Sequence, residues 1–498
     1  MTTESRPRPI EGLDPIAPDD GRRILYNPDS MAVIRGPAEL MRRAEAMAEG
    51  RRASAEPSAD DLAALQRVLP VITRPPSFTA AEGVAKVLTR LNVGNTYHCN
   101  MGCSYCYNEL DSKDRKGSEV PRGMSAQVGR ETIDAFVDQA GDEKQLSLCF
   151  IGGEPLLEKA RLYEMVAYGR QRCAERGITL SVSVYTNGTG VTDELIDWIN
   201  DNEIGVVVSL DGPPTINDAH RVFKNGRGTA KLVLRNIRRM MDRLAIPWRR
   251  VNAVAAEARA ILPLARWFRD LGFNDIHIQT AYGEDGFGRR GDVPDVVELM
   301  HWYRERLLAG EVLAVAPFSN ILGRLVERRA NVTSWYPCTT GVSSLGVAPS
   351  GTLYPCHHFL EEDDFALGHV RDGLTSAQRR VPLAKRVDQR EPCRSCWARH
   401  ACGGECYHRA HSAGRGYDGV IEEACDGRKS LIGLTLELYA DLARSHRQVL
   451  AALVRQHYTP LVPVEQAYAA TDLSDYGLVP TRPATASPRH LPVLNLSR

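Results

Sequence analysis

Six apolar segments of strand length, separated by amphipathic segments of helical length, occupy residues 88 to about 285 and constrain the fold more than any other feature. Because a helical segment between strands lets the chain cross back over a sheet, consecutive strands would run parallel with helices covering them. The pattern therefore predicts an α/β domain with a parallel sheet and covering helices. The predicted strands are Leu88–Val93, Gln145–Ile151, Leu180–Tyr185, Gly205–Leu210, Arg250–Ala255 and Asp275–Thr280.

The first predicted strand runs into a loop that carries Cys99, Cys103 and Cys106, spaced C-x3-C-x2-C. In parallel barrels, functional groups gather where strands end and loops begin. Three thiolates on so short a loop can hold three irons of a [4Fe-4S] cluster, which leaves the fourth iron without a protein ligand. Zinc is the alternative, but its fourth ligand would have to be His98. This residue directly precedes Cys99 and is badly placed to complete a tetrahedral site.

The overall composition, 43% hydrophobic and 25% charged, is typical of a globular protein. Lys plus Arg and Asp plus Glu both number 62, so no net charge attracts nucleic acid or an anionic membrane. We find no apolar run of roughly 18 to 20 residues and no signal peptide, so we expect a cytoplasmic protein. Thiols stay reduced in the cytoplasm, and clustered cysteines there indicate metal. Ten of the twelve cysteines are clustered, and Cys149 and Cys173 are predicted to be buried packing residues.

A second cysteine-rich region covers residues 338 to 425 and shows little periodicity. Its composition is typical of a segment held together by metal instead of by a hydrophobic core. Helical periodicity precedes it at Val296–Leu308 and Asn320–Arg329, and returns from Arg428 to Gln456. The seven cysteines of this region are Cys338, Cys356, Cys393, Cys396, Cys402, Cys406 and Cys425.

The two ends of the chain differ from the predicted barrel. Arg23–Tyr26 and Met31–Ile34 are predicted to be short strands about a turn, and Pro37–Ala48 and Ala59–Val68 to be helices. This N-terminal region either docks a peptide along its hairpin edge or caps the next domain. The proline-rich tail from Thr459 is predicted to be extended or disordered.

With these motifs the chain resembles the radical S-adenosylmethionine (SAM) superfamily, whose C-x3-C-x-aromatic-C and GGEP motifs match Cys99–Cys106 and Gly152–Pro155. The resemblance implies that SAM chelates the open iron, and that one electron cleaves it to a 5′-deoxyadenosyl radical able to abstract hydrogen from an unactivated C–H bond. The glycines of this motif would let the backbone approach SAM, and an acceptor there would suit the SAM ammonium. The guanidinium of Arg221 would suit the SAM carboxylate. The implied SAM contacts are Tyr105, Gly152, Gly153, Glu154, Asn187, Ser209 and Arg221.

The seven later cysteines match the spacing of the SPASM domain, a C-terminal extension of many radical SAM peptide and protein maturases. The resemblance implies two auxiliary [4Fe-4S] clusters and hence three clusters in all. The second auxiliary cluster lacks a fourth cysteine, so either a non-cysteine group or a substrate thiolate would complete it. A zinc ribbon is the alternative for Cys393–Cys406. The implied ligand sets are Cys393, Cys396, Cys402 and Cys425 for one cluster, and Cys338, Cys356 and Cys406 for the other.

The resemblance also implies the fold class and the order of domains. We expect an α/β protein in which a partial (β/α)6 radical SAM barrel is followed by a cysteine-rich SPASM domain, with a small N-terminal α+β extension. The expected domains are an extension that could dock a peptide, the barrel, the SPASM domain, and a C-terminal helix with a proline-rich tail. Their expected ranges are residues 1–85, 86–325, 330–430 and 431–498.

The resemblance implies an enzyme that cleaves SAM with an electron from a donor such as flavodoxin or ferredoxin and then oxidises a peptide side chain. Anaerobic sulfatase maturases share this architecture, but they carry an aspartate after the cysteine that corresponds to Cys356, where this chain has His357. His357 is a candidate base or, alternatively, a hydrogen-bond partner of cluster sulfur.

The stretches Tyr354–Phe359 and Phe365–Val370 resemble the C-H-x-F and L-G-x-V segments of maturases that act on ribosomally made peptides. Some of these maturases form thioether links. We therefore predict a radical SAM oxidoreductase that cross-links a ribosomally made peptide or small protein carrying a leader segment. The alternatives are formylglycine formation, oxidation of a small molecule, and a non-enzymatic iron–sulfur electron carrier.

Overall fold

A twisted sheet of nine strands forms the centre of the molecule, in the order β10-β9-β8-β7-β6-β5-β4-β11-β12. Every neighbouring pair is parallel except β11 and β12, which are antiparallel. The computed structural model describes residues 8–9, 21–51, 57–73, 87–106, 121–245, 249–255, 258–280, 293–327, 332–375 and 385–457.

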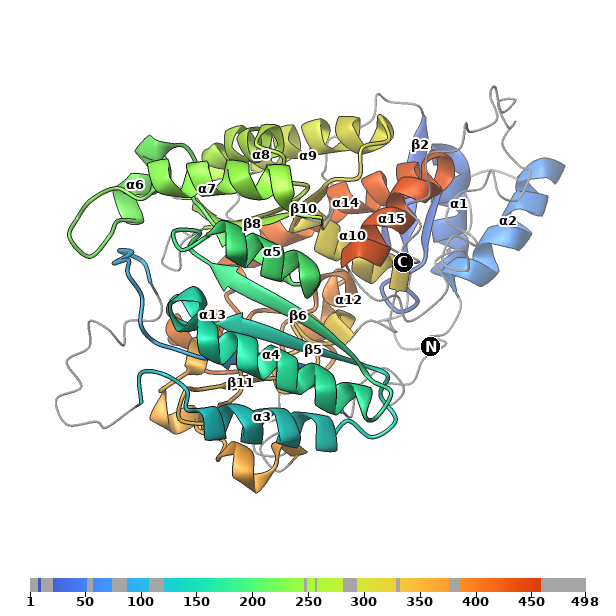
Figure 1. Cartoon of the computed structure of the whole chain (residues 1–498). Coiled ribbons are helices and arrows are strands. Elements are labelled where there is room, and N and C mark those ends of the chain that lie inside the picture. The colour runs from blue at the N-terminus through green and yellow to red at the C-terminus, as the bar shows by residue number, and fades with distance from the viewer. Residues whose placement is uncertain are drawn as a thin grey trace.

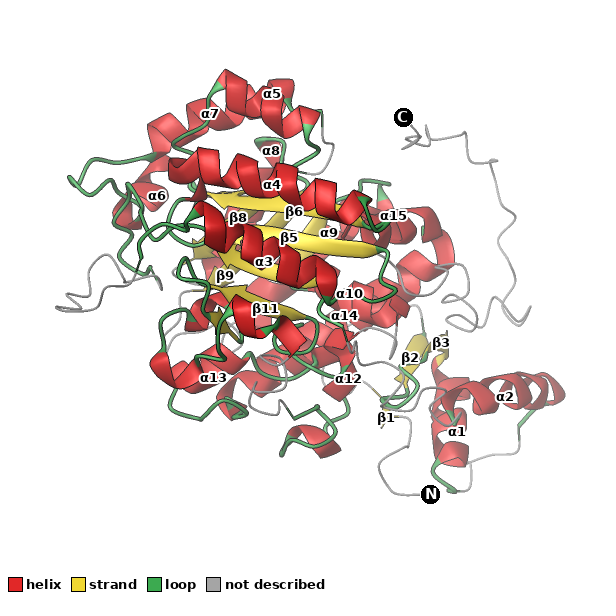
Figure 2. Cartoon of the chain, turned by 60° about the horizontal axis from the view of Figure 1, so that its bottom comes forward, coloured by secondary structure: helices red, strands yellow, loops and turns green. Residues whose placement is uncertain are grey.

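All six predicted barrel strands are present, with their ends within two residues of the predicted ones. They are β4 (Arg90–Gly94), β5 (Gln145–Ile151), β6 (Thr179–Thr186), β7 (Gly205–Ser209), β8 (Arg250–Ala255) and β9 (Asp275–Thr280). Helices cover one face of this sheet, and Figure 2 shows α3 and α4 lying over the strands. These helices are α3 (Ala126–Asp138), α4 (Lys159–Ala174), α5 (Asp193–Asp201), α6 (Pro214–His220), α7 (Ala230–Arg243), α8 (Ile261–Asp270) and α9 (Val293–Leu308).

The cysteine-rich region contributes strands to the same sheet. The sequence analysis did not predict these strands, because the region shows little periodicity. Strand β11 (Ser344–Val347) pairs in parallel with β4, and β12 (Leu353–Tyr354) pairs with β11. At the opposite edge, β10 (Ala314–Ala316) pairs in parallel with β9 and leads into α10 (Phe318–Glu327). The expected boundary between residues 325 and 330 therefore separates two regions that share one sheet.

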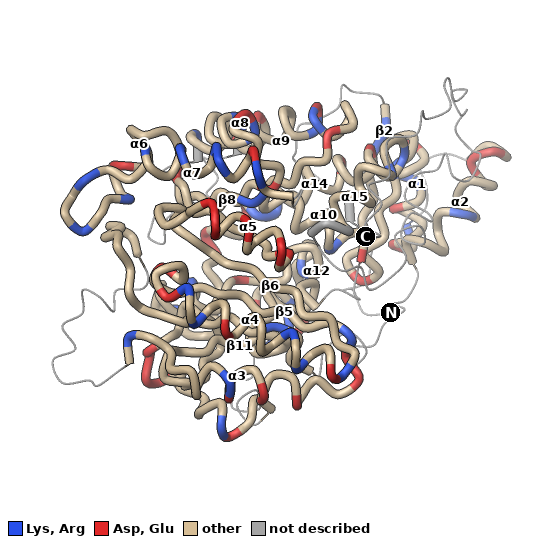
Figure 3. Tube along the Cα trace, viewed as in Figure 1, with Lys and Arg blue, Asp and Glu red and all other residues tan. Residues whose placement is uncertain are grey.

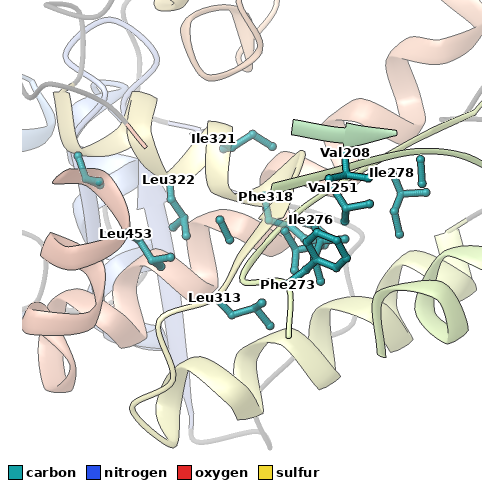
Figure 4. Packing of buried hydrophobic residues seen from close by; sticks show 14 of the residues in the cluster. Val208, Val251, Phe273, Ile276, Ile278, Leu313, Phe318, Ile321, Leu322 and Leu453 are labelled. Atoms are coloured by element: carbon teal, nitrogen blue, oxygen red, sulfur yellow. The ribbon is translucent and has the colours of Figure 1, made fainter. Parts of the chain in front are cut away.

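The predicted C-terminal helical stretch forms two helices, α14 (Cys425–Ser445) and α15 (Arg447–His457). Two shorter helices, α12 (Arg399–Cys402) and α13 (Tyr407–Ser412), precede them. Figure 4 shows that one apolar core runs from the barrel strands, through Val208 and Ile276, to Leu322 on α10 and Leu453 on α15. The proline-rich tail that begins at Thr459 lies outside the described residues.

The N-terminal region is a small α+β unit with its own apolar core, which includes Leu25, Met41 and Leu65. A capping box between Ser58 and Asp61 begins its second helix. Figure 1 places this unit beside α14 and α15. Its elements are β1 (Arg8–Pro9), β2 (Arg22–Tyr26), β3 (Val33–Pro37), α1 (Ala38–Ala48) and α2 (Ala59–Ile72), and its three strands pair antiparallel in sequence order.

Buried ion pairs attach this N-terminal unit to the rest of the chain. Arg35 pairs with Asp441 of α14, and Arg304 of α9 donates to the other oxygen of the same carboxylate at 2.8 Å. Arg399 of α12 pairs with Asp29 in the turn after β2. The unit therefore packs on the C-terminal helices and on the cysteine-rich region.

Among the described residues, no helix is both long enough and apolar enough to cross a membrane. Figure 3 shows basic and acidic residues interspersed along the outer helices, in agreement with the equal numbers of the two charges in the sequence.

We expect Asp441→Asn to destabilise the protein by about 3 kcal/mol, because it removes the shared partner of a buried arginine, Arg35. The free energy of unfolding, measured by anaerobic chemical denaturation, checks this value. The control is Asp197→Asn, which weakens a surface pair with Arg243 and should change stability by no more than about 0.5 kcal/mol. Equal effects of the two substitutions would contradict the importance that we assign to the Asp441 contact.

Candidate functional site

The loop with Cys99, Cys103 and Cys106 follows the end of β4 and is held in place by backbone hydrogen bonds. Gly102 N donates to Val222 O at 2.9 Å, and Ser104 N donates to His220 O at 3.2 Å. The pKa of the Cys103 thiol is raised to about 11, mainly by burial and in part by the neighbouring Cys106 and Cys99, while the charge of Arg221 opposes this shift. The structure thus brings the three thiols together, and iron binding would have to displace their protons.

Two glycines after β5 pack directly against this cysteine loop. Gly153 N donates to Thr96 O at 2.9 Å, and a Cβ atom on Gly153 would lie 2.3 Å from His98 O. Gly152 has a φ of 145°, a backbone angle that residues other than glycine rarely adopt. The resemblance assigned these glycines to close approach of SAM, whereas in the structure they let two protein loops approach each other.

Glu154 is buried, and its carboxylate joins the ends of two strands. One oxygen accepts hydrogen bonds from Leu156 N at 3.1 Å and Thr186 Oγ1 at 2.8 Å, and the other accepts from Asn187 N at 2.7 Å. A ligand at this loop would therefore meet the backbone of residues 152–155 and not this carboxylate. The Asn187 side chain donates to Asn100 at 2.9 Å and lies 3.8 Å from Cys99 Sγ.

Tyr105 of the cysteine loop contacts Arg221. This contact lies near the end of β7, whose last residue is Ser209. Arg221 donates to the Tyr105 hydroxyl at 2.9 Å, and this hydroxyl donates to Asp211. Asp211 also accepts from Val254 N at 3.0 Å, which fixes the group to β8. Six of the seven predicted SAM-contact residues thus lie in the cysteine loop or at and just beyond the carboxyl ends of β5, β6 and β7. Arg221, which follows α6, joins them through its hydrogen bond to Tyr105.

Four of the later cysteines surround one cavity of about 280 Å³, which Arg428 and Lys429 also line. The cysteines are Cys393, Cys396, Cys402 and Cys425. Burial raises the pKa of Cys393 to about 11, and Cys402, Cys425 and Cys396 raise it further, against the charge of Arg390. Four thiols around a shared cavity with basic side chains fit a [4Fe-4S] cluster, which carries negative charge and takes four thiolate ligands.

The other three cysteines, Cys338, Cys356 and Cys406, form a separate group. Burial raises the pKa of Cys406 to about 11, and the nearby Cys338 raises it further. Burial also raises the pKa of Cys356, and the nearby thiols of Cys338 and Cys406 contribute to this increase. Aromatic residues, including Phe359 and Tyr407, pack around this group.

No three Cys, His, Asp or Glu side chains among the described residues lie close enough together to bind a single metal ion. The ligands of a four-iron cube stand farther apart than those of one ion, because each ligand binds a different iron.

His357 is partly buried in a short helical turn after Cys356. Its ring lies 4.3 Å from that of His358, which stacks at 4.8 Å on His408. Burial lowers the pKa of His357 to about 4, and the positive charges of Arg90 and His408 contribute. The imidazole is therefore neutral near pH 7, and placing a proton on it is unfavourable. Its role as a base stays a prediction.

The sequence analysis missed the polar inner face of the barrel. Arg250 on β8 pairs with the fully buried Asp275 on β9, and His277 Nε2 lies 3.0 Å from the other Asp275 oxygen. A cavity of about 380 Å³ lies beside them, lined by His277, Arg324, Cys402 and others. The alternation of polar and apolar residues in β8 and β9 was the available signal, because strands buried on both faces are apolar throughout.

Comparisons with known proteins match part of this chain to a family and find similar proteins. Residues 96–245 match the family described as the Radical SAM superfamily. The chain is 25% identical over 328 residues to the serine-type anaerobic sulfatase-maturating enzyme of Klebsiella aerogenes, covering 64% of this chain and 78% of that enzyme. It is 23% identical over 304 residues to the cysteine-type anaerobic sulfatase-maturating enzyme of Clostridium novyi, covering 58% of this chain and 78% of that enzyme.

Solved structures share the fold. The structure of histidine-tagged anSMEcpe with bound AdoMet has a TM-score of 0.63 and 20% identity, covering 74% of this chain and 98% of that one. Native anSMEcpe with bound AdoMet and the Cp18Cys peptide has a TM-score of 0.60 and 19% identity, covering 72% of this chain and 99% of that one. The predicted α/β partial barrel with a cysteine-rich C-terminal region is therefore confirmed.

We expect Gly153→Ala to displace the cysteine loop, because the new methyl group would collide with the backbone of Tyr97 and His98. The purified variant should lose about one third of its iron if three equal clusters are present, and it should no longer cleave SAM. Gly102→Ala is the matched control, because it lies inside the C-x3-C motif and its Cβ would meet nothing within 4 Å. Full iron content and SAM cleavage in Gly153→Ala would contradict the role given to this contact.

Proposed function

Because the chain belongs to the radical SAM superfamily, we propose that it cleaves SAM reductively and oxidises side chains of a ribosomally made peptide or protein. The observation that carries this proposal is the presence of three separate cysteine groups in one fold. One group lies at the carboxyl ends of the barrel strands, and two lie in the region that completes the sheet. Such extra groups suit an enzyme that must take electrons from its substrate as well as start a radical reaction.

In this proposal Cys99, Cys103 and Cys106 hold a [4Fe-4S] cluster whose open iron binds SAM. The bound cofactors supply a carbon-centred radical that abstracts hydrogen from an unactivated C–H bond. Arg221 forms an ion pair with the SAM carboxylate. The backbone of residues 152–155 accepts hydrogen bonds from the SAM ammonium. Asn187 and Ser209 bind the ribose hydroxyls.

We further propose three [4Fe-4S] clusters and an intramolecular thioether cross-link as the product. The cavity of about 280 Å³ lined by four cysteines supports the first auxiliary cluster, and the group of Cys338, Cys356 and Cys406 supports the second. His357 after Cys356, in place of the aspartate of sulfatase maturases, supports a product other than formylglycine. The substrate would carry a leader segment that the N-terminal α+β unit docks, and flavodoxin or ferredoxin in the cytoplasm would supply electrons.

Formylglycine formation is the second candidate, because the two relatives named above are anaerobic sulfatase-maturating enzymes of the serine and cysteine types. The structures of anSMEcpe include a complex with a peptide, which also favours a peptide substrate in general. The two candidates differ in the bond that is made.

To distinguish the two products, we would co-express the protein anaerobically with each short open reading frame beside its gene and analyse the peptides by tandem mass spectrometry. A thioether removes two hydrogens per link, and fragment ions between the two linked residues should be missing. Formylglycine leaves all backbone fragments and adds an aldehyde that hydroxylamine traps. Co-expression with Cys103→Ala should leave the peptide unchanged. If the wild-type protein cleaves SAM but modifies neither these peptides nor sulfatase peptides, the proposed substrate class is wrong.

The proposed clusters also predict how iron content and folding change. Cys393→Ala should remove about one third of the bound iron and sulfide while SAM cleavage persists, since the cysteine loop is intact. Residues 338–425 of the iron-free protein should become sensitive to protease, and anaerobic reconstitution should restore resistance. Ser395→Ala is the matched control, because it lines the same cavity without a thiol. Identical proteolysis of iron-free and reconstituted protein would contradict the proposal.

A further inference from the structure

Two tyrosines whose hydroxyl oxygens are buried stack on each other beside the group of Cys338, Cys356 and Cys406. The rings of Tyr407 and Tyr417 lie 4.7 Å apart, and their planes differ by only 2°. Both hydroxyl oxygens are buried, and neither has a hydrogen-bond partner in the part of the chain that the structure describes. A buried polar group without a partner costs about 1–3 kcal/mol, so two of them side by side require an explanation.

The same two side chains lie close to the cysteines of this group. Tyr417 interacts electrostatically with all three thiols, and Tyr407 interacts with Cys338. Tyr407 also directly follows Cys406 in the chain, and Tyr407 and Cys356 belong to the same buried cluster. The two phenols therefore belong to the same packed group as these thiols.

A buried arginine holds both tyrosine-bearing segments in place. Arg390 donates to Glu405 O at 3.4 Å, just before Cys406 and Tyr407, and to Asp418 O at 3.1 Å, just after Tyr417. Its guanidinium also lies 5.7 Å from the centre of the Tyr407 ring. The positions of the two phenols are thus fixed from outside the cysteine group.

Another tyrosine in the same cluster shows what a satisfied phenol looks like there. The Tyr97 hydroxyl donates to Glu361 at 2.7 Å. The environment of this cluster therefore does not force phenols to remain unpaired, although the hydroxyls of Tyr407 and Tyr417 have no partner among the described residues.

We propose that Tyr407 and Tyr417 donate O–H hydrogen bonds to sulfur atoms of the iron–sulfur cluster held by Cys338, Cys356 and Cys406. This inference rests on the proposed function for the presence of that cluster. Sulfur atoms at the cluster provide the acceptors that the protein does not, and donors aimed at cluster sulfur stabilise the more negative, reduced state. The tyrosine pair therefore raises the reduction potential of this cluster and makes it a better electron acceptor.

The test uses full-length, anaerobically reconstituted protein and the substitutions Tyr417→Phe and Tyr407→Phe. We would measure iron and sulfide content and titrate the cluster potentials by EPR, assigning the signal of this cluster by its absence in Cys356→Ala. Each substitution should leave iron content unchanged and lower the potential, so that the ratio of reduced to oxidised cluster at a fixed potential falls about tenfold, or ~59 mV for one electron. The control is Tyr303→Phe, which removes a buried phenol of the main core and should not shift the potential.

A second measurement needs no variant. Pulsed EPR of the reduced wild-type protein in H2O and D2O should detect exchangeable protons coupled to this cluster, and Tyr417→Phe should lose at least one of them. Unchanged potentials in both variants and in the double variant, with full iron content, would overturn the proposal. Loss of iron in Tyr417→Phe would also overturn it, because the phenol would then be a ligand. If wild type and Cys356→Ala have equal iron content and the same signals, the three-cluster proposal fails and this inference with it, whereas SAM cleavage would still stand.

Discussion

The parallel pairing of β11 with β4 is the contact on which the arrangement of the whole molecule depends. Strand β4 leads into the loop with Cys99, and β11 lies between Cys338 and Cys356, so one set of backbone hydrogen bonds relates two cysteine groups. A Cβ atom on Gly346 of β11 would lie 2.8 Å from the backbone of Cys356, so this strand also fixes where that cysteine lies. The cysteine-rich region is therefore part of the barrel's sheet, and its position does not depend on a flexible linker.

The barrel combines an apolar outer layer with a charged interior, and the two have different roles. Outward side chains of β4 to β9 form the core with the helices and contribute most of the stability, since each buried apolar side chain contributes about 1.5–3 kcal/mol. The inward pair of Arg250 and Asp275 contributes less net stability, because desolvating two charges offsets much of their attraction.

The sequence predicted the elements well and their contacts poorly, for identifiable reasons. Strands such as Gln145–Ile151 were predicted with correct ends because apolar runs and flanking polar turns are local signals. The pairing of β11 with β4 joins residues about 250 positions apart, and no local pattern of four residues reports it. The motif at Gly152–Pro155 was found, but its glycines contact the cysteine loop and its carboxylate contacts Thr186, which only the folded backbone reveals. Cys149 and Cys173 are buried as predicted, at 1% exposure each.

The raised pKa values of the cysteines connect the fold with its proposed cofactors. Burial disfavours thiolates at Cys103, Cys393 and Cys406, so the protein alone would hold neutral thiols in spaces shaped for a charged group. Iron binding releases those protons and replaces weak thiol contacts with metal–sulfur bonds, so its free energy adds to that of folding. The barrel loop rests on a large apolar core, whereas residues 338–425 have few long helices and strands of their own. Loss of iron should therefore disturb the cysteine-rich region before the barrel, even though the two share one sheet.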